Sequence, residues 1–77
     1  MRASSRRRHG WTKVHALRRE YRPGYAVQHC GHPTALWPYH GVTPRTDLLL
    51  APNGRGFPTL NDAQLAVEAD YLEHLTG

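Results

Sequence analysis

Gly24–Gly41, which reads GYAVQHCGHPTALWPYHG, is the stretch on which the predicted fold depends. It contains two runs that favour strands, Tyr25–Gln28 and Ala35–His40, because aromatic and β-branched side chains fit a pleated sheet. Gly31-His32-Pro33 separates the two runs, and glycine and proline together favour a turn there. The stretch therefore predicts an antiparallel hairpin whose apolar face must be covered by another part of the chain.

The segment before this hairpin has two interpretations. Four apolar residues between positions 11 and 21 recur at helical spacing: Trp11, Val14, Leu17 and Tyr21. This periodicity predicts a short amphipathic helix, which Pro23-Gly24 would end. The alternative is an extended segment that joins the hairpin, because Trp, Val and Tyr also favour strands. Residues 1–10 have no apolar periodicity and are expected to form a flexible basic arm.

The second half of the chain predicts one strand and one helix. Asp47–Ala51 is short and apolar, as a buried strand would be, and Pro52-Asn53-Gly54 predicts a turn after it. Thr59 is a good N-cap residue, so a helix is expected to begin just after it. Five positions of this helix form an apolar stripe that should cover the sheet: Leu60, Ala63, Val67, Tyr71 and Leu75.

These elements together predict an α+β fold in a single small domain, residues 11–77. We expect a three-stranded antiparallel sheet packed by the C-terminal helix, with the short N-terminal helix beside it. Leu65 and Leu72 form a second, narrower apolar line on the C-terminal helix. This line is partly exposed in a monomer and becomes a contact surface in a dimer or a complex. In the alternative arrangement, the hairpin wraps around the helix and buries both lines.

Charge is divided unevenly along the chain. The net charge is +4, but residues 1–22 hold eight of the ten basic side chains against Glu20 alone, and residues 23–77 are net negative. A basic leading segment favours an anionic partner, either nucleic acid or an acidic protein surface. The candidate partner-binding residues are Arg6, Arg7, Arg8, Lys13, Arg18, Arg19 and Arg22, with Trp37 of the hairpin as an apolar contact.

The hairpin also contains side chains that can bind metal: His29, Cys30, His32 and His40. Adjacent strand residues point to opposite faces, so His29 and Cys30 cannot easily share one ion, and there is no C-x-x-C motif. Cys30, His32 and His40 remain the residues that would hold zinc if one were bound. The preferred interpretation is a buried thiol flanked by histidines that cap the turn, with no metal and no cofactor.

Several function classes are disfavoured by the sequence. No catalytic motif is present, so we do not predict an enzyme. A single cysteine excludes an internal disulfide, which fits a reducing cytoplasm. The longest apolar run, Leu48–Ala51, has four residues, so no membrane span is expected.

The hairpin GYAVQHCGHPTALWPYHG followed by FPTLNDAQLAVEADYL resembles small proteins encoded by bacterial genomes and prophages. Small basic proteins of this kind include the phage-encoded anti-CRISPR proteins. The resemblance implies an inhibitor that binds a host CRISPR effector, a ribonucleoprotein complex, in the bacterial cytoplasm and blocks its access to nucleic acid. The alternative is a small basic accessory protein that binds DNA or RNA directly through the same arginines.

Overall fold

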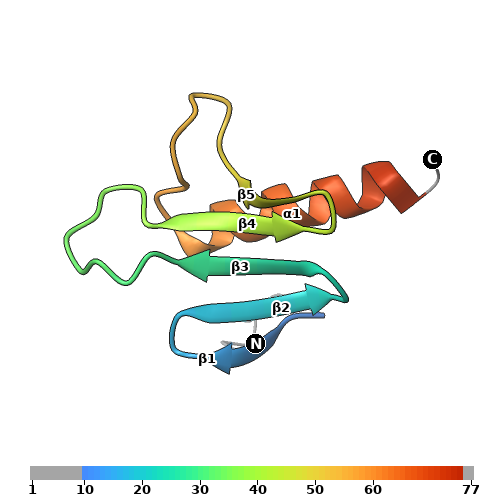
Figure 1. The fold of residues 1–77 in the computed structure, drawn as a ribbon, viewed down its shortest axis with the longest axis horizontal. Coiled ribbons are helices and arrows are strands. Elements are labelled where there is room, and N and C mark those ends of the chain that lie inside the picture. The colour runs from blue at the N-terminus through green and yellow to red at the C-terminus, as the bar shows by residue number, and fades with distance from the viewer. Residues whose placement is uncertain (1–9, 76–77) are drawn as a thin grey trace, which may run out of the picture.

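A computed structural model describes residues 10–75 of the chain. Five strands precede one helix: β1 (Thr12–His15), β2 (Arg18–Arg22), β3 (Tyr25–His29), β4 (Tyr39–Thr43), β5 (Thr46–Leu49) and α1 (Leu60–Leu75). The strands form one antiparallel sheet in chain order, so each pairs with the strand that follows it (Figure 1). The helix crosses one face of the sheet and packs against β3 and β4. The predicted α+β class and the covering helix are confirmed, but the sheet has five strands instead of three.

The predicted N-terminal helix is wrong, and the segment forms the hairpin of β1 and β2. The two rings at its ends explain why: Trp11 stacks on Tyr21 with the ring centroids 5.0 Å apart. In a helix these residues would lie about 15 Å apart along the axis. The hairpin also leaves Val14 and Leu17 on the surface, although the helical periodicity had placed them on the buried face. The expected basic arm, except for Gly10, lies outside the described residues.

The hairpin predicted from Gly24–Gly41 is present, but its second strand begins later than expected. β4 starts at Tyr39, and residues 35–37 belong to the loop between β3 and β4. Pro38 has no amide hydrogen to donate, so only its carbonyl takes part, accepting the amide of Cys30 at 2.8 Å. The wide loop that results carries Leu36 and Trp37 on the surface.

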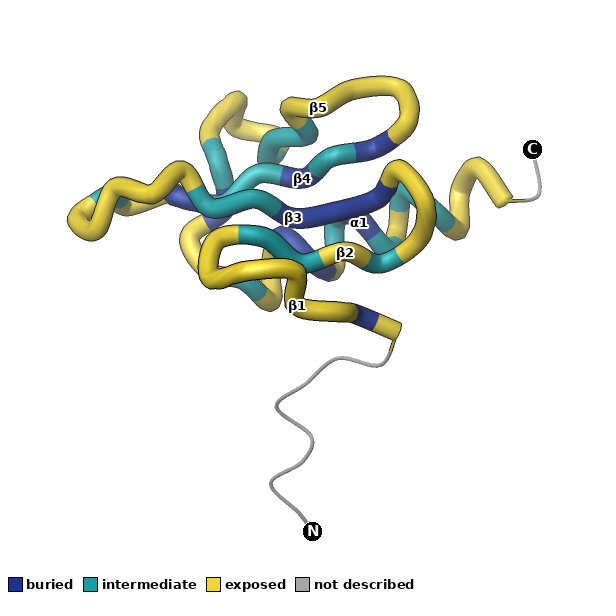
Figure 2. Tube along the Cα trace, turned by 60° about the horizontal axis from the view of Figure 1, so that its bottom comes forward, coloured by how far each residue is buried: buried dark blue, intermediate teal, exposed yellow. Residues whose placement is uncertain are grey.

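The core lies between α1 and the helix-facing side of the sheet. Val27 and Val67 are fully buried, and Ala63 lies beside them. The central strand β3 is the most deeply buried strand, whereas the edge strands β1 and β5 are largely exposed (Figure 2). Gly41 allows this close packing, because a Cβ there would lie 2.8 Å from Cγ2 of Val67.

An aromatic cluster extends the core toward β1 and β2. The ring of Tyr71 on α1 meets Tyr21 and Tyr25 edge to face, with centroids 5.4 and 5.2 Å away. The indole Nε1 of Trp11 donates a hydrogen bond of 2.6 Å to Glu68 of the helix. These contacts hold the outer strands against α1, although α1 packs mainly on β3 and β4.

The helix begins as the sequence predicted. The hydroxyl of Thr59 accepts a hydrogen bond from the amide of Asp62 at 3.1 Å, which satisfies one free donor of the first turn. Leu65 and Leu72 are 46% and 60% exposed, so the arrangement that buries both apolar lines is wrong. Within residues 10–75, no helix is long and apolar enough to cross a bilayer.

Candidate interaction surface

The hairpin of β1 and β2, residues 12–22, collects most of the basic side chains that the structure describes. We call it the basic hairpin; its charged residues are Lys13, Arg18, Arg19, Glu20 and Arg22. Four of the predicted partner-binding residues are thus brought together at one edge of the sheet (Figure 1). The other three arginines of that prediction, Arg6, Arg7 and Arg8, lie outside the described residues.

Two cations face each other directly across this hairpin. Lys13 on β1 is the register partner of Arg19 on β2. Opposite residues of an antiparallel pair have Cβ atoms about 5 Å apart, and like charges in these positions destabilise the sheet. Within residues 10–75, neither side chain forms a hydrogen bond or an ion pair that would offset the repulsion. The pair is therefore a concentrated positive site at an open edge.

Arg18 is held differently, by two polar neighbours. Its Nε lies 3.3 Å from Oε2 of Glu20, and one of its terminal nitrogens donates to Oε1 of Gln28 at 3.2 Å. Gln28 sits opposite both Arg18 and His40, so the three side chains form a row across β2, β3 and β4. The charge of Arg18 is partly neutralised by Glu20, which leaves Lys13 and Arg19 as the stronger site for an anion.

Arg22 and Arg45 both contact residues of the aromatic cluster. The guanidinium of Arg22 lies over the ring of Tyr21 at 4.3 Å from its centroid and near Tyr71 at 5.4 Å. Arg45 donates to the hydroxyl of Tyr25 at 3.1 Å and pairs with Asp70 on α1. These bonds raise the pKa of Arg45 above its ordinary value, the contact with Tyr25 contributing most. Both arginines therefore have structural partners within the domain.

The described part of the chain has no net charge, but its positive and negative side chains are unevenly distributed. Six basic and six acidic side chains lie within residues 10–75, so the net charge of the whole chain comes from the four arginines before residue 10. The basic hairpin carries a net charge of +3, and the rest of the described chain, which includes the acidic positions of α1, carries −3. Positive charge is thus concentrated in the basic hairpin and negative charge in the rest of the described chain.

Trp37, the predicted apolar contact, lies in the loop between β3 and β4 and is 39% exposed. The guanidinium of Arg55 lies over its ring at 4.5 Å from the centroid. One face of the indole is therefore covered by a cation from the loop before α1. Leu36 beside it is more exposed, at 71%.

The residues considered as zinc ligands, for which no bound ion was predicted, are not brought together. Within residues 10–75, Cys30, His32 and His40 form no cluster with metal-binding geometry. The thiol of Cys30 is exposed instead of buried and accepts the amide of His32 at 3.4 Å. Nδ1 of His29 accepts the amide of Gly31 at 2.8 Å, so a histidine caps the turn as expected.

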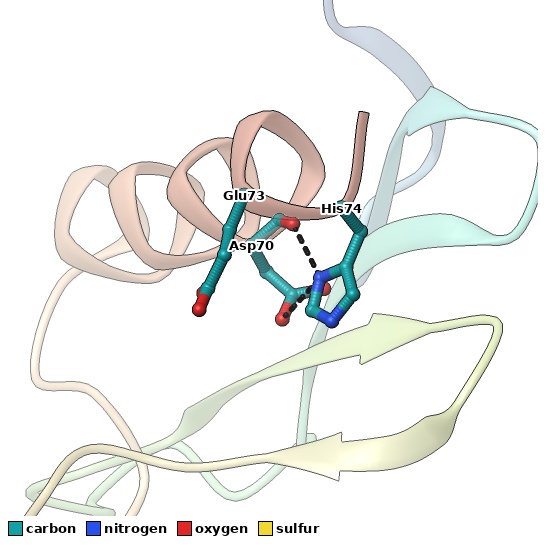
Figure 3. Close-up of side chains that lie close together, drawn as sticks. All are labelled: Asp70, Glu73 and His74. Carbon is teal, nitrogen blue, oxygen red and sulfur yellow. Dashed lines mark hydrogen bonds and ion pairs between the residues drawn. The ribbon is translucent and has the colours of Figure 1, made fainter. Parts of the chain in front are cut away.

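A different group of potential ligands lies near the end of α1. Asp70, Glu73 and His74 each have one ligand atom within 4.8 Å of the others (Figure 3). Nδ1 of His74 lies 3.6 Å from the Asp70 carboxylate and 2.9 Å from the Asp70 carbonyl, and Arg45 also binds this carboxylate. Arg45 already pairs with the Asp70 carboxylate, so the group is explained by ion pairing and hydrogen bonding within the protein.

His40 lies on β4, and its surroundings in the sheet alter the pKa of its imidazole. Burial against the sheet lowers its pKa, the nearby charge of Arg18 lowers it further, and Asp47 partly opposes both effects. The imidazole is therefore neutral at pH 7, and the row of Arg18, Gln28 and His40 carries a single positive charge.

A small hollow lies between the turn of the basic hairpin and the start of α1. Its volume is about 30 Å³, and its lining residues are Ala16, Leu17, Arg18, Arg19, Val27, Tyr39 and Leu60. A hollow of this size holds a water molecule or two, far below the several hundred Å³ of a usual small-molecule site. It is therefore too small for an ordinary small-molecule ligand.

Comparisons with protein-family models, with curated proteins and with solved structures find no match for this chain. The surface must therefore be interpreted from its own chemistry. Sequence reasoning identified Lys13 and Arg19 as basic but did not predict their juxtaposition, which depends on strand pairing. The contact between Trp11 and Glu68 was also missed, because it joins residues far apart in the chain.

Proposed function

We propose that this protein binds nucleic acid through the basic hairpin and the arginines that precede it. The observation that supports the proposal is the facing pair Lys13 and Arg19, which has no counter-charge within residues 10–75. A pair of this kind weakens the fold on its own. A phosphate backbone would remove that repulsion, because phosphates pack closely and each accepts hydrogen bonds from lysine and arginine.

The uneven distribution of charge in the domain supports a defined orientation of the protein on nucleic acid. Nucleic acid would approach the basic hairpin from the open edge of β1, near Lys13 and Arg19. Glu68 of α1 reaches the start of this hairpin, where it is bonded by Trp11. Arg2, Arg6, Arg7 and Arg8 precede β1 in the sequence and bring four more positive charges to the leading segment of the chain. The expected binding is electrostatic and independent of base sequence.

The test is binding of the purified chain to fluorescently labelled DNA and RNA at several salt concentrations. We expect affinity to fall steeply between about 50 and 200 mM salt, with each neutralised phosphate adding about 0.9 to the logarithmic slope. Replacing Arg6, Arg7 and Arg8 by Gln should reduce that slope. Arg55→Gln is the matched control, because it removes one cation outside the basic hairpin. No binding at the lowest salt would contradict the proposal.

A second candidate function is inhibition of a host CRISPR effector, as the resemblance to anti-CRISPR proteins implies. The exposed line of Leu65 and Leu72 favours it, because apolar residues on a helix surface are typical of protein contacts. In this version the basic hairpin would dock on an acidic part of the effector in the bacterial cytoplasm. Leu65→Lys with Leu72→Lys should then abolish inhibition of CRISPR interference in cells, whereas direct nucleic-acid binding would persist.

A further inference from the structure

We infer that the basic hairpin selects double-stranded over single-stranded nucleic acid and holds the duplex by its phosphates; this rests on the proposed function. Proteins that prefer single strands combine positive charge with exposed aromatic rings on which bases stack. The present chain has the positive charge, but nearly all of its aromatic rings pack in or against the core.

Six of the seven aromatic side chains lie in or against the core. Trp11 is 7% exposed and is held by its stack on Tyr21 and by its bond to Glu68. Tyr21, Tyr25 and Tyr39, the aromatic residues of the strands, all pack toward the helix-facing core. Trp11, Tyr25 and Phe57 are buried, and Tyr21, Tyr39 and Tyr71 are half-buried against the core, so none of the six is an open stacking platform.

The seventh ring, Trp37, is exposed but already paired with a cation. Arg55 lies over it at 4.5 Å from the ring centroid, so a base would have to displace the guanidinium from that face. Trp37 also belongs to the β3–β4 loop, whereas Lys13 and Arg19 lie on β1 and β2. It therefore does not complete a stacking site on the basic hairpin.

The sheet face away from α1 offers no aromatic platform either. Val27 and Gly41 are register partners on the helix side, so their neighbours Ala26, Gln28, His40 and Val42 point to the opposite face. Glu20, the partner of Ala26, adds a negative charge to that face. Arg18, the partner of Gln28, lies on the same face, but Glu20 partly neutralises its charge. Arg19 is the partner of Val27, so Arg19 and Lys13 lie on the helix side of the sheet, near the edge formed by β1, and this pair remains the proposed contact.

A duplex is the better ligand for such a site. Double-stranded DNA carries one charge per about 1.7 Å of axis, compared with one per about 3.4 Å along a single strand. The adjacent cations Lys13 and Arg19 should therefore bind the more closely spaced phosphates of a duplex more strongly. No stacking of bases on exposed rings offsets this preference in favour of the single strand.

The test compares a short labelled DNA duplex with each of its separated strands, using the full chain and fluorescence anisotropy across a salt series. The duplex should bind several-fold more tightly than either strand. The double variant Lys13→Gln with Arg19→Gln should lower duplex affinity and reduce the logarithmic salt slope by about 2, as expected for two lost phosphate contacts. Arg55→Gln is the control for loss of one positive charge and should leave the duplex slope unchanged.

The possible failures are distinguishable. Equal or tighter binding of the single strands would overturn the duplex inference while leaving nucleic-acid binding intact. An unchanged slope in the double variant would overturn the assignment of Lys13 and Arg19 as the phosphate contact. Absence of binding to duplex and strands alike would instead contradict the proposed function. A circular dichroism spectrum of the double variant that matches the parent would confirm that any loss reflects the surface and not the fold.

Discussion

Lys13 on β1 lies directly opposite Arg19 on β2, and within residues 10–75 neither cation has a counter-charge. The repulsion between the two cations lowers the stability of the fold, whereas the proposed binding of phosphate depends on it. A substitution of Lys13 should therefore change stability and binding in opposite directions. Lys13→Glu should therefore stabilise the free protein by about 1 kcal/mol, since it replaces a repulsive cross-strand pair by an attractive one. Thermal unfolding without ligand measures the effect, and Lys13→Gln should give a smaller rise. A fall in the melting temperature of both variants would show that Lys13 supports the fold.

Trp11 should contribute more to stability than the other tryptophan. Trp11→Phe retains a ring but removes the hydrogen bond to Glu68, for a predicted cost of about 2 kcal/mol, because the acceptor is charged and partly buried. Trp37→Phe is the matched control and should cost less than about 1 kcal/mol, since that side chain lies on the surface. Urea unfolding of both variants tests the difference. Equal costs would mean that Trp11 does not join β1 to α1.

Gly41 and Val67 should be energetically coupled. Gly41→Ala places a methyl group 2.8 Å from Cγ2 of Val67 and 3.0 Å from Leu49, which should cost about 2 kcal/mol through overpacking. Val67→Ala leaves a cavity and should cost a similar amount, about 2 kcal/mol. The double variant should be more stable than the sum of the single costs implies, because the added methyl group partly fills the vacated space. Strictly additive costs would contradict the packing described for this position.

His40 should make the fold sensitive to mild acid. Its pKa in the folded state lies below the ordinary value of 6.5, so the folded chain resists protonation more than the unfolded chain does. Stability from this group is fully present above that value and is lost as the pH falls through the lower, folded-state pKa. His40→Gln should flatten the fall in unfolding free energy between about pH 7 and pH 5. A parallel curve for variant and parent would show that His40 is not responsible.

The fold was predictable where local signals and tertiary packing agree. Tyr25–Gln28 forms β3 because its apolar residues meet the helix, and Thr59 caps α1 because its hydroxyl can reach the amide of Asp62. For residues 11–21 the alternative prediction, an extended segment that joins the sheet, is the correct one. The helix was preferred because the turn of the basic hairpin, at Ala16 and Leu17, contains no glycine, proline or asparagine. Helical spacing of apolar residues in that segment was therefore misleading.

For the interaction surface, the sequence predicted which residues are charged but not how their side chains are arranged in space. Sequence reasoning could place positive charge in residues 1–22, but it could not show that Lys13 faces Arg19 while Arg18 bonds to Gln28. That distinction depends on strand register, and the register shifts between Lys13 and His15. Cys30, His32 and His40, the set considered for zinc, form no cluster within residues 10–75, because Cys30 and His32 lie in the β3–β4 loop whereas His40 lies on β4.

The most direct test of the central claim is the affinity of Lys13→Glu for a DNA duplex, measured beside its melting temperature. The account predicts a variant that is more stable than the parent and binds duplex at least tenfold more weakly, as loss of a phosphate contact and introduction of a repulsive charge require. Unchanged duplex affinity in a folded variant would contradict the claim that the Lys13–Arg19 pair binds phosphate.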